Sequence, residues 1–236
     1  MGVRVGAFEF VPGLLPTTGA VALVILTLSL AHWQASRAGE KQALQALYEQ
    51  RLHEPLVELS AAPRGEDLLF RHVRAEGEYL ADAQLFIDNQ VHEGRAGFRV
   101  VTPLHVDGSG DVVLVERGWI ERDAKYPAAP AVAVPSGHVT VTGIAVTPPR
   151  RYLELGPGTA SGGVWQNLSI ERFRETRREN VPPFVIAADV APEGLAVVRE
   201  RPDTGIERHV EYELTWYSLA ALTAVLWLAL NWRRRP

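Results

Sequence analysis

The segment LLPTTGAVALVILTLSL, residues 14–30, lies in a stretch between Glu9 and Arg37 that contains no Asp, Glu, Lys or Arg. A helix rises about 1.5 Å per residue and the hydrocarbon core of a bilayer is about 30 Å thick, so this stretch is long enough to cross a membrane. Residues 214–232 are also uncharged, contain four Trp or Tyr residues and form a second candidate span. The sequence therefore predicts a two-pass membrane protein.

Charge predicts the orientation of the two spans. The segment before the first span holds one Arg and one Glu, whereas the last four residues hold three Arg. Because basic segments stay on the cytoplasmic side, we expect both termini in the cytoplasm and the long middle segment in a periplasm-like space. The expected parts are a cytoplasmic N-terminus at 1–12, a transmembrane helix at 13–33, an outer domain at 34–213, a second transmembrane helix at 214–232 and a basic cytoplasmic tail at 233–236.

A cleaved signal peptide is the alternative interpretation of the first span, because Ser-Leu-Ala at 29–31 is similar to a cleavage site. The apolar run is long for a signal peptide. It also passes directly into RAGEKQALQALYEQRL, residues 37–52, whose apolar residues recur at helical spacing. We therefore favour an uncleaved helix that continues past the membrane.

Composition excludes several classes of function. The 24 basic and 28 acidic residues give a formal charge of -4, which leaves no basic surface for the phosphates of a nucleic acid. The chain has no cysteine, so disulfides, thiolate metal sites, iron–sulfur clusters and cysteine nucleophiles are excluded.

From residue 68 onward, short β-like runs separated by Gly, Pro and Asp replace the helical pattern. Two of them, 97–106 and 112–120, flank the five-residue connection DGSGD, which predicts a hairpin. Seven strands with two membrane helices predict an α+β membrane protein whose outer domain is a mainly antiparallel sheet or small barrel. The other expected strands are 72–80, 84–90, 138–146, 183–190 and 194–200.

The remaining segments of the outer domain are predicted to be loops and one short helix. The proline-rich stretch 126–137 and the glycine-rich stretch 156–163 are typical of surface loops. Residues 169–180 are expected to contain a helix that begins after Ser169 as N-cap and ends before Pro182.

The sequence contains no recognisable catalytic motif. None of the seven histidines forms the H-x-x-x-H pair of a helical metal site, and the G-x-S-x-G motif of hydrolases does not occur. The glycines near residue 158 lack the flanking strand and helix of a phosphate loop. Carboxylates such as Asp82 and Asp88 fall where solvation explains them.

Two tryptophan-containing segments, Arg117-Gly118-Trp119 and Trp165-Gln166, place a large amphipathic ring beside polar groups. The simpler interpretation is a core tryptophan whose N–H finds an acceptor. A partner-binding surface is the alternative.

His209 is the strongest single candidate for a ligand-binding residue. If the second helix begins one or two turns before residue 214, then His209, Tyr212, Glu213 and Trp216 lie on one stripe at the outer membrane boundary. An imidazole that a neighbouring carboxylate orients can ligate haem iron through its other nitrogen. A histidine held by water or lipid headgroups is the alternative, which physics alone favours. His32, near the outer end of the first helix, is the candidate second ligand.

A set of short motifs follows the chain in a fixed order. It is W-Q-x-x-R-x-x-x-K at 33–41, G-x-Y at 77–79, D-N at 88–89, G-x-x-V-x-T-P-L at 97–104, R-G-W at 117–119, W-Q-N at 165–167 and H-x-x-Y-x-x-T-W at 209–216. Over nearly its whole length the chain resembles the surfeit locus protein 1 family of cytochrome c oxidase assembly factors, in its bacterial form. Four positions depart from the family pattern: Ala31, Gln90, Glu116 and Ser169.

The resemblance implies a non-enzymatic role in the maturation of a haem-copper terminal oxidase in the bacterial inner membrane. The protein would bind haem a and assist its delivery to oxidase subunit I, with haem a synthase and the lipid bilayer as further partners. The haem site would comprise His209 as iron ligand with Tyr212 and Trp216 of the same motif, and His32, at a position that the family motif leaves open, is the added candidate. The implied partner-binding residues are Trp33, Gln34, Arg37, Arg117, Gly118, Trp119, Trp165 and Gln166. The alternatives are a scaffold that holds an oxidase intermediate without haem and an enzyme that works beside haem synthesis.

Overall fold

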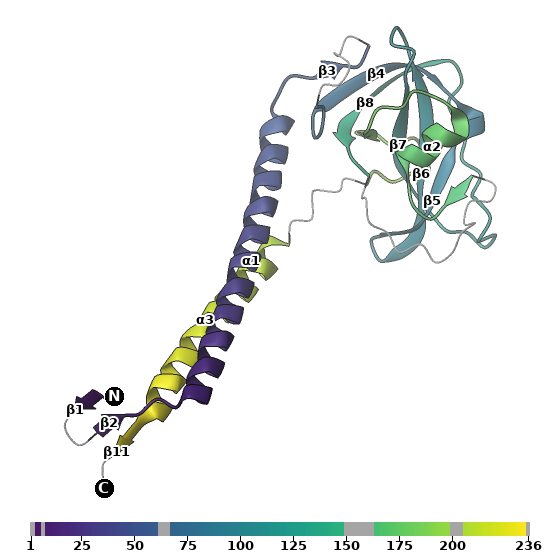
Figure 1. The fold of residues 1–236 in the computed structure, drawn as a ribbon. Helices are drawn as coiled ribbons and strands as arrows, with labels where there is room; N and C mark the ends of the chain where they lie inside the picture. Colours follow the sequence, from purple (N-terminus) through teal and green to yellow (C-terminus); the bar gives the residue numbers. More distant parts are fainter. Residues whose placement is uncertain (1–2, 6–7, 61–66, 149–162, 199–204, 235–236) are drawn as a thin grey trace. The chain divides into compact units, whose positions relative to one another are not determined.

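The computed structural model describes five stretches of the chain, residues 3–5, 8–60, 67–148, 163–198 and 205–234. They belong to two compact units. One unit combines Met1–Leu47 with Pro202–Pro236, and the other is Tyr48–Arg201. The first consists of two long helices and a small sheet, and the second is a β-barrel with added strands (Figure 1).

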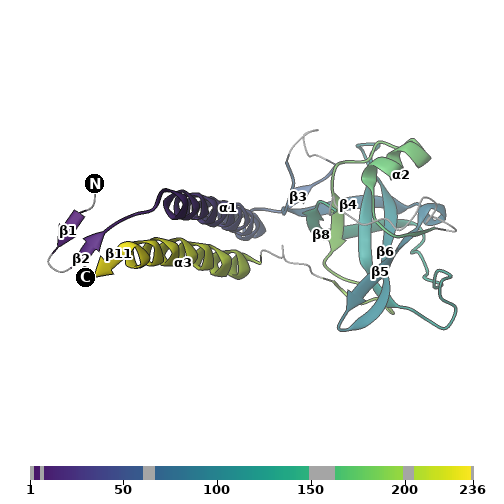
Figure 2. The same ribbon diagram turned by 60° about the horizontal axis from the view of Figure 1, so that its bottom comes forward.

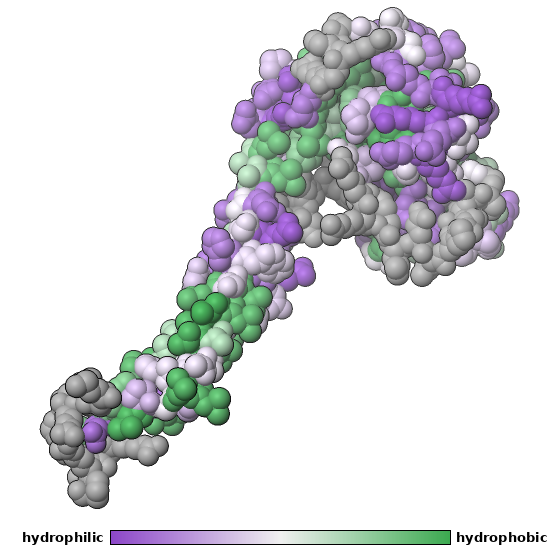
Figure 3. Space-filling model, in the orientation of Figure 1, coloured by the Kyte–Doolittle hydropathy of each residue, from purple (hydrophilic) through white to green (hydrophobic). Residues whose placement is uncertain are grey.

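The two helices are α1, Leu14–Leu52, and α3, Ile206–Asn231. They run antiparallel and side by side in both ribbon views (Figures 1 and 2). Each is long and apolar enough to cross a membrane, and only 11% and 6% of their most apolar windows is buried. Core helices of a soluble protein would be mostly buried. The helices instead expose a band of hydrophobic side chains (Figure 3), as lipid-facing helices do.

Small side chains form the seam of the helix pair. The buried residues of α1 are Thr27, Ala31, Gln34 and Ala38, which recur every three or four positions. That spacing keeps one stripe of a helix turned toward an antiparallel neighbour. The half-buried or buried positions of α3 follow the same spacing: His209, Glu213, Trp216, Ala220, Thr223 and Trp227.

Hydrogen bonds and a small sheet join the ends of α1 and α3 that lie near the chain termini. Trp227 Nε1 donates to Thr17 Oγ1 at 3.1 Å. The backbone N–H of Gly13 donates to Asn231 Oδ1 at 3.4 Å. Next to these contacts, β2 pairs antiparallel with both β1 and β11. The bounds of this sheet are Val3–Val5 for β1, Phe8–Phe10 for β2 and Trp232–Arg234 for β11.

The second unit is a mixed sheet of eight strands in the order β3-β4-β8-β10-β7-β6-β5-β9. An additional antiparallel pairing of β4 with β6 closes five of these strands into a barrel. The strand bounds are Val57–Glu58 for β3, His72–Tyr79 for β4, Leu85–His92 for β5, Arg95–Val106 for β6, Val112–Glu121 for β7, His138–Val146 for β8, Val164–Trp165 for β9 and Val185–Ala188 for β10.

Alternation along the strands builds the two larger of the three hydrophobic cores among the described residues. One core takes a buried side chain from each of the five barrel strands: Val73, Leu104, Val115, Val141 and Ile186. The other lies under α2, Ile170–Arg177, whose Phe173 packs with Leu114 and Val185. Because β7 contributes to both cores, it is buried along nearly its whole length.

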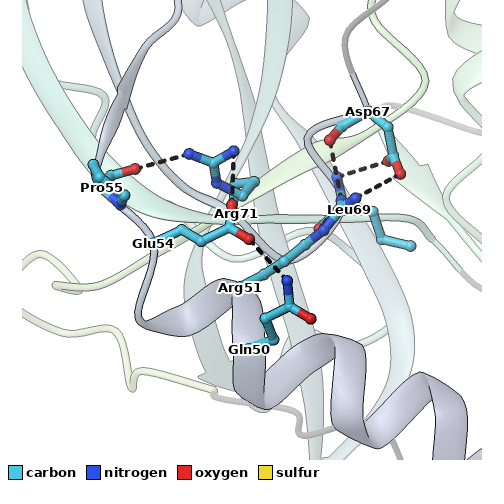
Figure 4. A network of polar contacts seen from close by, with 7 residues as sticks. All are labelled: Gln50, Arg51, Glu54, Pro55, Asp67, Leu69 and Arg71. Carbon is cyan, nitrogen blue, oxygen red and sulfur yellow. Dashed lines mark hydrogen bonds and ion pairs between the residues drawn. The ribbon is translucent and has the colours of Figure 1, made fainter.

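The last turn of α1 belongs to the barrel unit, and two arginines tie it to the segment before β4 (Figure 4). Arg51 donates to the carbonyl of Leu69 at 2.7 Å and to the carboxylate of Asp67 at 2.9 Å. Arg71 pairs with Glu54 at 2.9 Å and donates to the carbonyl of Pro55. The hydrogen bond from Arg51 lowers the pKa of Asp67.

The predicted fold class is confirmed: two long apolar helices flank a mainly antiparallel barrel. Six of the seven expected strands form, as does the hairpin that joins β6 to β7 through residues 107–111. The seventh, at 194–200, is wrong within its described part, where Ala196 forms only an isolated bridge with Trp119. Its pairing is limited to one residue because the edge of β7 is already taken by β10 further along.

The remaining predictions concern α2, the two loops and the length of α1. Ser169 caps α2, its hydroxyl accepting from the Arg172 N–H, as predicted. Residues 126–137 contain no helix or strand, as expected for a loop. The glycine-rich stretch 156–163 lies outside the described residues except for its last position. α1 joins the apolar run and the amphipathic pattern in one unbroken helix.

Candidate functional site

His209 lies on the seam of the helix pair and contacts α1. Because α3 begins at Ile206, His209 is already helical and turned toward its neighbour. Its Nδ1 is 2.6 Å from Oε1 of Gln34, whose side chain is buried in the seam. The sequence pointed to Glu213 as the polar partner of the imidazole. In the described contacts the partner is instead Gln34, 175 positions away along the chain.

The other residues expected at this site lie on different faces. Trp216 is half-buried on the same stripe as His209. Tyr212 is 53% exposed and turned away from the seam. His32 is exposed on α1, outside the seam that contains Gln34. The structure thus brings His209, Gln34 and Trp216 to the seam and leaves the rings of Tyr212 and His32 on the outer surface of the pair.

Two further residues of the α1 motif face outward. Trp33 is 51% exposed, and the guanidinium of Arg37 lies 6.0 Å from the centre of its ring. Arg37 also donates to Glu40 at 2.7 Å. A ring and a cation four positions apart share one helix face, so Trp33 and Arg37 form an exposed aromatic and cationic patch on α1.

A second polar site lies within the barrel unit around Arg117. A register shift between β6 and β7 at Val100 and Val101 leaves Arg117 as the extra residue of a β-bulge. Such a bulge redirects a side chain. The Arg117 guanidinium is 3% exposed and lies 5.4 Å from the centre of the Tyr79 ring.

Neutral acceptors hold the charge of Arg117. Its Nη1 donates to Oε1 of Gln84 at 3.0 Å and reaches Oγ1 of Thr102 at 3.4 Å, and its Nη2 donates to the carbonyl of Ala133 at 2.9 Å. Among the described residues, no carboxylate pairs with it. Burial therefore lowers the pKa of Arg117, opposed by Tyr79. Burial likewise raises the pKa of Tyr79, opposed by the Arg117 charge.

The neighbouring Glu116 is a buried carboxyl on the same strand. It pairs with Arg99 of β6 at 3.4 Å. Burial raises the pKa of Glu116, and the attraction of Arg99 opposes the shift only in part. The site therefore holds two strongly desolvated ionisable groups on consecutive residues.

The tryptophan motifs of the barrel are buried, as the core interpretation requires. Trp119 donates from Nε1 to the carbonyl of Gln90 at 2.9 Å. Gly118 has a φ of +145°, and a Cβ there would lie 2.8 Å from the carbonyl oxygen of Ala196. Trp165 is buried under the guanidinium of Arg172, 4.8 Å from the ring centre. Contact of Arg117, Gly118, Trp119, Trp165 and the half-buried Gln166 with a partner stays a prediction.

Sequence reasoning missed most of the groups that complete these sites. Gln84, Thr102 and Tyr79 meet Arg117 from three different elements, and no local pattern marks that meeting. The expectation that solvation explains Asp88 is wrong, because the residue is buried and paired: Arg122 donates to its Oδ1 at 2.7 Å and Tyr126 to its Oδ2 at 3.1 Å. The D-N motif at 88–89 was the one available signal.

The chain is similar to a known protein family over most of its length. Residues 21–221 match the model of the SURF1 family. The Surfeit locus protein 1 of Mus musculus is 28% identical over 225 residues, which cover 88% of this chain and 72% of that protein. The SURF1-like protein of Rickettsia felis is 24% identical over 227 residues, 89% of this chain and 95% of that protein. The range matched by the family model begins within α1, includes the barrel unit and ends within α3.

We expect Arg117→Lys to lower the free energy of unfolding by about 2 kcal/mol, because one ammonium cannot replace a fork that bridges the acceptors of Gln84 and Ala133. The matched control is Arg177→Lys, which alters an exposed ion pair with Asp82 and should leave the stability unchanged. Denaturant unfolding of the detergent-purified protein measures both. Equal stability of the two variants would contradict the role given to Arg117.

We expect the stability advantage of Glu116→Gln over the wild type to grow as pH rises. The raised pKa of Glu116 means that the folded state binds more protons than the unfolded state above the ordinary value of 4.5, so wild-type stability falls there as pH increases. The amide of the variant has no such proton. Asp67→Asn is a control of opposite sign, because a lowered pKa makes wild-type stability rise with pH up to 3.8. Unfolding curves recorded between pH 3 and pH 8 test both expectations. If the difference in free energy of unfolding between Glu116→Gln and the wild type does not change with pH, the prediction is contradicted.

Proposed function

The chain belongs to the SURF1 family, which is associated with cytochrome oxidase assembly, and we propose that it is an assembly factor for a haem-copper terminal oxidase. In this proposal it binds haem a and assists the delivery of that haem to oxidase subunit I. It does so without catalysing a reaction. Haem a is therefore its cargo.

The position of His209 is the observation that supports haem binding. Neutral imidazole is a common axial ligand of haem iron, and His209 lies near the start of a helix that is apolar enough to enter a bilayer. Haem is a large apolar ring, and Trp216 and Tyr212 supply aromatic surface within two turns of the imidazole. The donor set of this chain thus fits a haem at the helix pair.

His32 is a weaker candidate for a second ligand. It is exposed on α1 and lies outside the seam that contains Gln34 and faces His209. A haem bound to both imidazoles would have to lie against the outer surface of the pair. We therefore assign His209 as the ligand and keep His32 as the second candidate.

The proposed location is the bacterial inner membrane, with both termini in the cytoplasm and residues 34–213 in the periplasm. Two helices of suitable length and the three arginines of the tail support it, as does the bacterial origin of the Rickettsia felis relative. The proposed partners are oxidase subunit I, haem a synthase and the lipid bilayer. Trp33 and Arg37 are the exposed residues on α1 best suited to contact them.

A scaffold that stabilises an oxidase intermediate without haem is the second candidate function. The contact between His209 and Gln34 favours it, since a hydrogen bond between two helices in a membrane can serve packing alone. Under this alternative the imidazole holds the helix pair together and carries no ligand. The two functions differ in whether the purified protein contains haem.

We expect the detergent-purified wild type from cells that make haem a to show a haem spectrum, and His209→Ala to lose or strongly shift it. Membrane abundance of the variant should stay near normal, because the imidazole lies on the seam of two helices and not in the barrel core. Visible spectra of equal amounts of protein, before and after reduction, give the result.

Trp227→Phe is the matched control for this experiment. It removes a different side-chain hydrogen bond between the helices, that to Thr17, and leaves the imidazole in place. The variant should retain the wild-type haem content. A wild type without haem supports the scaffold, and a His209→Ala protein with unchanged haem rules out the ligand assignment.

We expect alkaline phosphatase to be active when fused near Ser136 and inactive when fused after Pro236. The enzyme folds only outside the cytoplasm, so activity reports the side on which each fusion lies. Ser136 lies in the loop before β8, whereas Pro236 ends the basic tail. The reverse pattern would overturn the proposed orientation.

A further inference from the structure

The hydrogen bond between Gln34 and His209 has a direction that follows from its atoms. The atom of Gln34 that faces the ring is Oε1, and an amide oxygen can only accept. Nδ1 of His209 must then carry the hydrogen and donate. A neutral imidazole carries one hydrogen, so its lone pair is on Nε2. The contact therefore selects the tautomer whose Nε2 can bind a metal.

The surroundings of Gln34 hold this side chain in one place. It is buried in the seam, and the flanking seam positions on α1 are Ala31 and Ala38. Their small side chains leave the space that a long amide needs to cross to α3. A buried polar side chain costs free energy unless its hydrogen bonds are made, so the bond to His209 fixes the amide in turn.

The side chain of Gln34 is uncharged, and for the histidine ring this matters as much as the length of the side chain. A carboxylate opposite the ring would favour the imidazolium, whose two nitrogens both carry hydrogens. The amide orients the ring without adding charge.

We propose that Gln34 is the positioning residue of the haem site: its amide oxygen holds His209 in the Nδ1–H tautomer and thereby presents Nε2 to the iron. The iron part of this inference rests on the proposed function. The tautomer does not, because it is a property of the protein without haem. In metal sites generally, the group that receives the other ring N–H sets the orientation and basicity of the imidazole, and its loss costs about 10- to 100-fold in affinity.

One consequence is that the ligand on α3 is oriented by α1. Separation of the helices would remove the acceptor and free the ring to rotate and to exchange tautomers. Haem binding is thereby coupled to helix pairing, without any contact between haem and Gln34.

The first test reads the tautomer in the apoprotein. The full-length protein is labelled with 15N at histidine and studied by NMR in detergent, with His209→Ala to assign the ring signals. We expect a protonated Nδ1 and an unprotonated Nε2 for His209 in the wild type, and a mixture of tautomers in Gln34→Leu. A protonated Nε2 in the wild type would overturn the proposal.

The second test titrates haem a into the wild type, Gln34→Leu and Gln34→Glu. We expect affinity to fall about 10- to 100-fold in Gln34→Leu. Gln34→Glu keeps an acceptor for the Nδ1–H, and because a carboxylate makes the ligand more basic, the haem that this variant binds should have a lower midpoint potential than in the wild type. A purely structural role would not move that potential. Trp227→Phe should leave affinity and potential unchanged.

The outcomes separate the two proposals. If the wild type binds no haem, the proposed function fails and the NMR result alone decides the role of Gln34. If the wild type binds haem through His209 while both Gln34 variants keep its affinity and potential, only the positioning role is overturned. Should Gln34→Leu not accumulate, the wild-type tautomer and the potential of Gln34→Glu still decide.

Discussion

The pairing of α1 and α3 depends on side chains that reach across the seam between them. Gln34 meets His209 and Thr17 meets Trp227, and the small side chains of Ala31 and Ala38 leave room beside Gln34. In hydrocarbon, apolar surface gives no net force between helices, so packing and hydrogen bonds must supply it. At the outer boundary of the pair, the buried polar side chain of Gln34 is likewise satisfied by His209.

The barrel unit meets a different constraint, the desolvation of charge. The bulge of β7 turns Arg117 to the interior, where Gln84 Oε1 and two other neutral oxygens accept its N–H groups. A cation held by neutral acceptors gains less than one paired with a carboxylate, yet it links β7, β6 and the loop that contains Ala133. Packing then explains each residue of the R-G-W motif. The guanidinium of Arg117 is buried, Gly118 has no room for a Cβ, and the N–H of Trp119 has an acceptor.

The sequence predicted those elements whose signal is local. Hydropathy located both long helices, period-two runs located six strands, and the hydroxyl of Ser169 marked the start of α2. The closure of the barrel through β4 and β6, and the short strands β3 and β9, depend on contacts between distant segments and leave no local pattern. The same limit applies to the sites: His209 was found because its motif and helix phase are local, whereas Gln34 as its partner requires the register between α1 and α3, which no single helix encodes.

The register between α1 and α3 also explains the spacing of the motif at residues 33–37 of α1. Trp33 and Arg37 are four residues apart and therefore share a face, whereas Gln34 follows Trp33 by one residue and points about 100° away around the helix. One short motif thus serves two surfaces, the seam toward α3 and the exposed side of α1. A helix with a single protein neighbour needs both: a polar group that meets the neighbour, and an aromatic and a cationic group that meet the membrane interface or a partner. The motif is compact because a helix turns from one surface to the other within a single residue.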